Sequence, residues 1–115
     1  MIFVIDDDQI MAECIARAVG REVRIFADGI EAMGEIAKGV LPEMIFLDIL
    51  LSGPDGFTFL NEMISYTDLA EIPVVVVSSL DLSGQDLSSY GVVGILNKDT
   101  MTPKEIKEYV IKYAR

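Results

Sequence analysis

Four short apolar runs of this chain end in polar side chains that could bind a metal ion or a phosphoryl group. Carboxylates are ligands of hard divalent cations, and an ammonium or hydroxyl group can bond to phosphoryl oxygens. Binding a metal ion or a phosphoryl group requires that the ends of these four apolar runs lie close together in the folded chain. The side chains, in chain order, are Asp6, Asp7 and Asp8, then Asp48, then Ser78 and Ser79, and finally Lys98.

The elements that must position these residues are short strands that alternate with helices. We predict strands at residues 2–5, 22–26, 44–47, 73–77 and 93–96, because each is a short run of β-forming residues. We predict helices at residues 9–19, 29–38 and 57–67, and a last helix that Thr102 caps and Pro103 begins. Asp8 is predicted to cap the first helix, and Gly20 to end it. Residues 81–90 are rich in Ser and Gly, so they predict at best a short, weak fourth helix.

Five strand–helix units in series predict an α/β fold with a doubly wound parallel five-stranded sheet. The 115 residues have the length of one domain, which we expect to span residues 1–115. In such sheets the carboxyl ends of the strands form the ligand site. The polar run ends are therefore expected to meet at one edge.

Carboxylates that meet there would repel one another by about 4 kcal/mol per pair at ~4 Å and an effective dielectric of ~20. Lys98 supplies one positive charge, and oxygen ligands favour Mg²⁺ or Mn²⁺ as a second source. Each of these residues taken singly has an ordinary structural explanation. Asp8 would be a helix cap, and Ser78 or Lys98 would be a polar residue at the end of a strand. Together they predict a site for phosphoryl transfer onto a carboxylate.

The composition excludes several other classes of protein. The net charge of −10 argues against direct nucleic-acid binding, and no apolar run approaches the ~20 residues of a membrane span. The chain has no His, which excludes His-dependent triads and His-ligated metals. The lone Cys14 cannot form an internal disulfide, and no targeting segment is apparent, so we expect a cytoplasmic protein.

The chain resembles the receiver domain of two-component response regulators over residues 2–114. The resemblance implies the strand order 2-1-3-4-5 and a domain that is phosphorylated rather than a turnover enzyme, with weak autophosphorylation and autodephosphorylation. The residues that carry the resemblance are Asp6, Asp7 and Asp8, Asp48 after Met-Ile-Phe-Leu, Asp55-Gly56 before the third helix, Ser78 after the valines, and Lys98 after Gly-Ile-Leu-Asn.

The resemblance also implies a role for each matching position. Asp48 matches the phosphoacceptor, Lys98 the lysine that pairs with a phosphoryl oxygen, and Ser78 the switch hydroxyl. Asp6 and Asp7 match the acidic pair that holds Mg²⁺ together with Asp48.

The resemblance also implies backbone groups that bind the metal and the phosphoryl group, and a second switch residue. The carbonyl of Leu50 would complete the metal shell, and N–H groups at Leu50 and Ser79 would bind the phosphoryl group. Ile95 stands where many relatives have an aromatic switch residue. Leu50 and Leu80 would flank the phosphoryl group and hinder an attacking water.

Some positions depart from the family pattern. Asp99 replaces a proline that often follows a cis peptide, which predicts a trans bond there and an acid that competes for Lys98. In the segment Leu51-Ser52-Gly53-Pro54, Ser52 stands where relatives often have a proline. None of these departures alters the acceptor, the acidic pair, the hydroxyl or the lysine.

The expected partners are a histidine kinase or a histidine phosphotransfer protein and a downstream target. The face of the fourth helix, fifth strand and last helix is the expected contact surface, also for a homodimer. Three alternatives remain open. One is a phosphatase of the haloacid dehalogenase type that uses Asp6. The others are a flavodoxin-like cofactor binder, which the three aspartates disfavour, and a degenerate receiver that acts only as a docking module.

Overall fold

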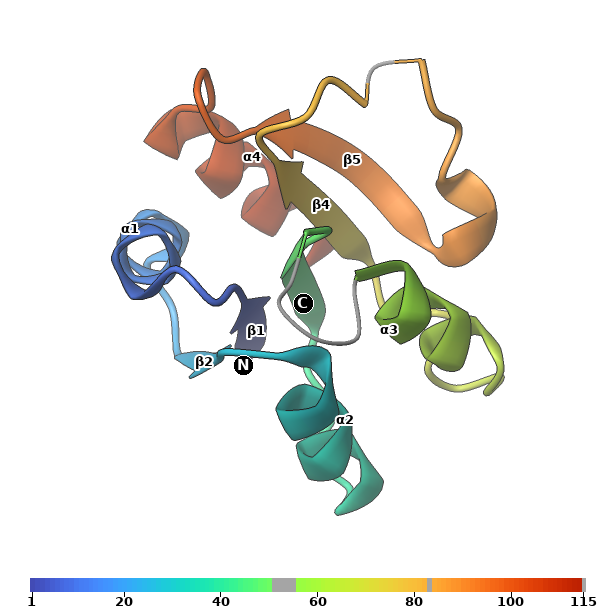
Figure 1. Cartoon of the computed structure of the whole chain (residues 1–115). Helices are drawn as coiled ribbons and strands as arrows, with labels where there is room; N and C mark the ends of the chain where they lie inside the picture. The colour runs from blue at the N-terminus through green and yellow to red at the C-terminus, as the bar shows by residue number, and fades with distance from the viewer. Residues whose placement is uncertain (51–55, 83, 115) are drawn as a thin grey trace.

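The computed structural model describes residues 1–50, 56–82 and 84–114, and it contains one five-stranded sheet (Figure 1). All strand pairs are parallel and the order is β2-β1-β3-β4-β5, which confirms the predicted fold class and order. The strands are β1 (Ile2–Ile5), β2 (Val23–Phe26), β3 (Met44–Asp48), β4 (Val74–Ser78) and β5 (Val92–Asn97). The helices are α1 (Gln9–Val19), α2 (Gly29–Ala37), α3 (Gly56–Ile64), the 3₁₀ helix η1 (Ser88–Tyr90) and α4 (Pro103–Tyr113).

Helices cover both faces of the sheet, which explains why its central strands are apolar without alternation. Phe3 and Ile5 of β1 point to the side of α2 and α3, whereas Ile2 and Val4 point to the side of α1 and α4. All four side chains are fully buried. Burying a side chain of this size stabilises the fold by roughly 1.5–3 kcal/mol, so the central strands anchor the two cores.

Local signals set the ends of the helices as expected. The Asp8 carboxylate accepts hydrogen bonds from the backbone N–H groups of Ile10 and Met11, and Gly20 ends α1 at a φ of 69°. Thr102 and Glu105 form a reciprocal capping box at the start of α4. The loops that follow β1 and β5 are therefore fixed where they enter α1 and α4.

The region after β4 agrees with the prediction of at best a short, weak helix, because the described part of residues 81–90 forms no α-helix. Only η1 is helical there. The Asp86 carboxylate accepts hydrogen bonds from both the N–H and the hydroxyl of Ser88, a local turn that competes with helix formation. The third helix is shorter than predicted: α3 ends at Ile64, and the Ser65 hydroxyl donates to the Asn61 carbonyl.

The last helix packs directly on β5, where the pairing of β4 with β5 shifts register at Val74 and Val75. The end of the Tyr109 ring lies directly over Gly94, so a Cβ at that position would require the ring to shift. Ile95 contacts the opposite core, on the side of α2 and α3. No helix in the described ranges has the length and apolarity to cross a bilayer.

Candidate functional site

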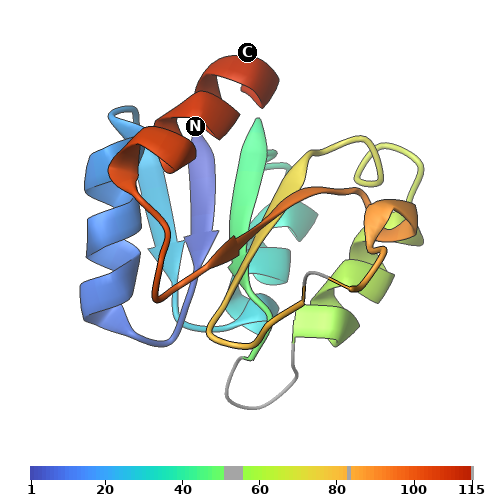
Figure 2. The ribbon, with the colours of Figure 1, turned by 90° about the horizontal axis from the view of Figure 1, so that it is seen from above.

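The site lies at the carboxyl edge of the sheet, where β1 and β3 end side by side (Figure 2). Ile5 pairs with Leu47, so Asp6 and Asp48 occupy the next position of neighbouring strands. Side chains alternate along a strand, which turns both carboxylates to the side of α1 and α4. They are only 2% and 4% exposed, respectively. Two neighbouring strands thus hold two buried acids in one place.

Lys98 supplies the positive charge that these acids need. Its Nζ lies 3.0 Å from Oδ2 of Asp6 and 3.1 Å from Oδ2 of Asp48. Its backbone N–H donates to the carbonyl of Ser78 at 2.9 Å, which extends the β4–β5 pairing beyond the strand. The strand register therefore sets where the lysine side chain begins.

The second oxygen of each buried carboxylate accepts a hydrogen bond from the backbone two residues further on. Asp8 N–H donates to Oδ1 of Asp6 at 2.9 Å, and Leu50 N–H donates to Oδ1 of Asp48 at 3.0 Å. These local bonds orient the carboxylates, so that Oδ2 of both faces Lys98.

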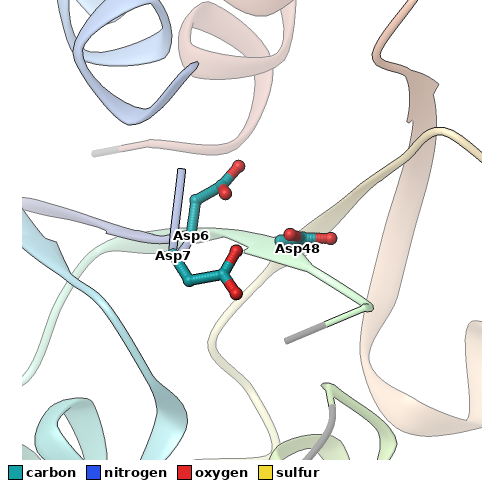
Figure 3. A group of neighbouring side chains, drawn as sticks. All are labelled: Asp6, Asp7 and Asp48. Carbon is teal, nitrogen blue, oxygen red and sulfur yellow. The ribbon is translucent and has the colours of Figure 1, made fainter. Parts of the chain in front are cut away.

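Asp7 completes a group that could hold a metal ion. One carboxylate oxygen from each of Asp6, Asp7 and Asp48 lies within 4.8 Å of the others, and Asp7 is exposed (Figure 3). Oδ2 of Asp6 is buried and, beyond its ion pair with Lys98, has no hydrogen-bond partner among the described residues. Oxygen donors with spare acceptor capacity fit a hard divalent cation such as Mg²⁺ or Mn²⁺.

Burial and charge shift two pKa values here. Burial raises the pKa of Asp6 above its ordinary value, although the bond from Asp8 and the charge of Lys98 oppose this. Burial disfavours the charged form of Lys98, but the two carboxylates of Asp6 and Asp48 beside it outweigh this and raise the lysine pKa. Lys98 therefore stays protonated at neutral pH.

Ser78 lies at this edge but is not hydrogen-bonded to the acids. Its side chain is fully buried, and its Oγ accepts a hydrogen bond from Leu80 N–H at 3.0 Å. Ser78 continues the alternation of β4 on the side of α2 and α3, the face that Ile95 also contacts. The backbone roles predicted for Leu50 and Ser79 remain predictions.

Two expectations concerned the loop around Lys98. The Lys98–Asp99 bond is trans, as predicted, and no peptide bond in the described ranges is cis. The expected competition by Asp99 is not seen, because the ion pairs described for Lys98 are with Asp6 and Asp48. The Asp99 N–H instead donates to Oδ1 of Asn97 at 2.8 Å.

Sequence reasoning missed the steric role of Gly56. A Cβ there would lie 2.6 Å from Cα of Ile49 and 3.0 Å from the carbonyl oxygen of Asp48. The Gly56 N–H also donates to the Ile49 carbonyl at 3.0 Å. The start of α3 thus packs on the backbone that carries Asp48. A glycine opening a helix was the available signal. Asp55 and residues 51–54, to which other expectations referred, lie outside the described residues.

Comparison with known proteins identifies the family. The family model described as the response regulator receiver domain matches residues 2–111, so this chain belongs to that family. Receiver domains of this family act in two-component signalling, where they receive a phosphoryl group on an aspartate from histidine kinases. This bears out the resemblance stated above.

Individual relatives agree with this assignment. The response regulator PleD of Caulobacter vibrioides is 34% identical over 72% of this chain and 19% of its own length. A protein-glutamate methylesterase/protein-glutamine glutaminase of Cereibacter sphaeroides is 26% identical over 87% of this chain and 29% of its own length. The chain thus spans less than a third of either relative, and their whole-protein activities do not follow from the match.

A solved structure, that of the phosphorylated cyanobacterial phytochrome response regulator RcpA, superposes with a TM-score of 0.79 and 27% identity. The superposition covers 97% of this chain and 91% of that one. The match extends over nearly the whole of both chains.

Proposed function

We propose that Asp48 is the aspartate that accepts the phosphoryl group. The observation that carries this proposal is its setting: a buried carboxylate at the end of β3 that bonds to Lys98 and to Leu50 N–H, beside Asp6 and Asp7. A carboxylate held by an ammonium group and a backbone N–H is fixed in position before the phosphoryl donor arrives.

The donor would be a phosphohistidine of a histidine kinase or of a phosphotransfer protein. A P–O bond forms to a carboxylate oxygen of Asp48 while the P–N bond breaks, and the donor histidine leaves as imidazole. Lys98 would pair with a phosphoryl oxygen, which the 3.1 Å distance from its Nζ to Asp48 supports.

Asp6, Asp7 and Asp48, with the carbonyl of Leu50, would hold Mg²⁺ or Mn²⁺. The ion would neutralise the charge that the incoming phosphoryl oxygens add to three carboxylates. N–H groups at Leu50 and Ser79 are the proposed further donors to the phosphoryl group.

The proposed output is a conformational switch through Ser78 and Ile95. Breaking the bond from Leu80 N–H would free the Ser78 hydroxyl to reach the phosphoryl group. The surface of η1, β5 and α4 would then contact a downstream protein or a second copy of the chain. We propose residues 1–115 as a single receiver domain that acts in the cytoplasm and turns over no substrate beyond its own phosphoryl group.

The experiment is to locate the phosphoryl group chemically. The protein is incubated with phosphoramidate and Mg²⁺, reduced with borohydride to convert the aspartyl phosphate to homoserine, and mapped by peptide mass spectrometry. Homoserine at position 48 is the expected result. Homoserine at position 6 would support the phosphatase alternative, and no label at any aspartate would leave a docking module as the better description.

A further inference from the structure

The acidity of this chain is concentrated in its middle segment. Residues 27–97 contain eleven Asp and Glu and a single base, Lys38, whereas the remaining residues contain eight of each. Helices α2 and α3 belong to the acidic part and cover one face of the sheet, while α1 and α4 cover the other (Figure 1). Beside α2, Lys38 lies 3.3 Å from Glu35, which also pairs with Arg24 of β2 at 3.1 Å, so both described cations there are engaged by a carboxylate outside the groove lining.

A groove of about 380 Å³ lies on this acidic side, between α2 and α3. Two large apolar side chains at its rim, Leu41 and Tyr66, are 51% and 57% exposed. Burying them against a partner would remove apolar area from water, which favours association. The apolar residues that line the groove are Met33, Ile36, Ala37, Leu41, Tyr66 and Leu69.

Only acids contribute charge to the groove among the described lining residues. Glu62 and Asp68 line it, and neither forms a described ion pair. Leu41 and Asp68 also line an adjoining hollow of about 770 Å³, which adds Glu71 and reaches the start of β5. The apolar floor thus continues along a surface whose rim carries several carboxylates.

We propose that this α2–α3 groove binds a basic amphipathic helix of another protein. Apolar side chains at i and i+3 or i+4 would enter between Leu41 and Tyr66, and flanking Lys or Arg would face Glu62 and Asp68. The charge selects this occupant: a nucleic acid, an anionic membrane or a second copy of the same acidic face would be repelled. The groove is separate from Asp48, so this inference does not depend on phosphorylation.

The test uses the full chain labelled with ¹⁵N and an acetylated, amidated 14-residue Leu/Lys peptide with helical amphipathic spacing. We expect amide shifts centred on residues that line the groove. A permuted peptide of the same composition, without an apolar face, and a Leu/Glu peptide of the same pattern should bind at least tenfold more weakly.

Two variants and two matched controls locate the site. Leu41→Ser with Tyr66→Ser, and Glu62→Lys with Asp68→Lys, should each weaken peptide binding about tenfold or more. Ile111→Ser, at a position 72% exposed on α4, and Glu108→Lys on the same helix should leave it unchanged. All these positions are exposed, and circular dichroism checks that each variant folds.

The proposal is overturned if the peptide does not bind. It is also overturned if shifts spread over the acidic surface without a centre in the groove, or if the α4 controls weaken binding as much as the groove variants.

Discussion

Two acidic regions of this molecule use the same residue types in opposite surroundings. At the carboxyl edge of the sheet, Asp6 and Asp48 are nearly inaccessible and share the ammonium group of Lys98. On the α2–α3 side, Glu62 and Asp68 are exposed and form no described ion pair. A buried carboxylate must have a cation or hydrogen-bond donors, whereas an exposed one is stabilised by water. The surroundings, rather than the residue type, determine what an acid can do.

The largest expected effect comes from removing one acid from each region. Asp48→Asn should abolish phosphorylation by phosphoramidate, because an amide oxygen cannot form the acyl phosphate. Asp68→Asn should leave phosphorylation unchanged. Mobility shifts in Phos-tag gels measure both, and retained labelling of Asp48→Asn would show that the acceptor lies elsewhere.

Removing the cation tests whether the buried acids depend on it. Lys98→Met should lower the free energy of unfolding by about 2–3 kcal/mol without metal, because two buried carboxylates then lack their partner. Millimolar Mg²⁺ should restore part of this loss by binding the native state. Lys38→Met, at a side chain 73% exposed, should cost about 0.5 kcal/mol or less. Urea unfolding measures all three, and equal losses for the two lysines would contradict the comparison.

Alanine substitutions of two glycines test how tightly each of the two regions is packed. Gly56→Ala should lower stability by about 1–3 kcal/mol, because the new Cβ would lie 2.6 Å from the Ile49 backbone. Gly34→Ala in α2 should raise stability by about 0.5–1 kcal/mol, since no atom lies within 4 Å of the new Cβ. Thermal unfolding gives both values, and a neutral Gly56→Ala would refute the tight contact at Asp48.

The rim of the site should control how long the phosphoryl group persists. Leu50 and Leu80 are 49% and 50% exposed at the loops that leave β3 and β4. We expect the double variant Leu50→Asn, Leu80→Glu to lose the phosphoryl group faster, on the order of tenfold, because polar side chains would no longer hinder water. Decay of the phosphoprotein in Mg²⁺ measures this, with Leu41→Ser as the control. Equal or slower decay in the double variant would be the contrary result.

The smallest expected effect is a pH dependence on the α2–α3 side. Hydrogen bonds from Arg24 and Lys38 hold the pKa of Glu35 below its ordinary value of 4.5. Because the folded-state pKa is the lower one, the stabilisation is present above pH 4.5 and is lost as pH falls through the folded pKa. Glu35→Gln should therefore be less stable than the wild type at pH 7 and indistinguishable from it in strong acid. A difference that persists or grows towards low pH in urea unfolding would contradict the assignment.

Much of the fold could be predicted because the strands are continuous apolar runs with distinct ends. Predicted and observed strand ends agree to within about one residue, since residues such as Pro73 and Asp48 interrupt the apolar runs there. The helix caps at Asp8 and Thr102 were equally local and equally predictable. The end of α3 was not, because weak propensities over residues 65–67 left the outcome to local turns.

The candidate site was predictable in its residues but not in its geometry. The positions of Asp6, Asp48 and Lys98 at strand ends made them candidates. The sequence did not show that this one lysine would form ion pairs with both acids. The contact between Gly56 and Ile49 and the groove between α2 and α3 depend on how separate elements pack, which no local pattern encodes.

The sequence by itself determined which side chains end the strands, in what order the strands follow, and that the acids need a cation. Those properties are local, because the pattern of apolar, capping and charged residues in a short segment determines them. Only the tertiary structure decided that Lys98, fifty residues from Asp48 in the chain, lies 3.1 Å from it. The parallel register places β1, β3 and β5 in one sheet, and side-chain alternation turns Asp6 and Asp48 to the same face, where the lysine that follows β5 can reach both.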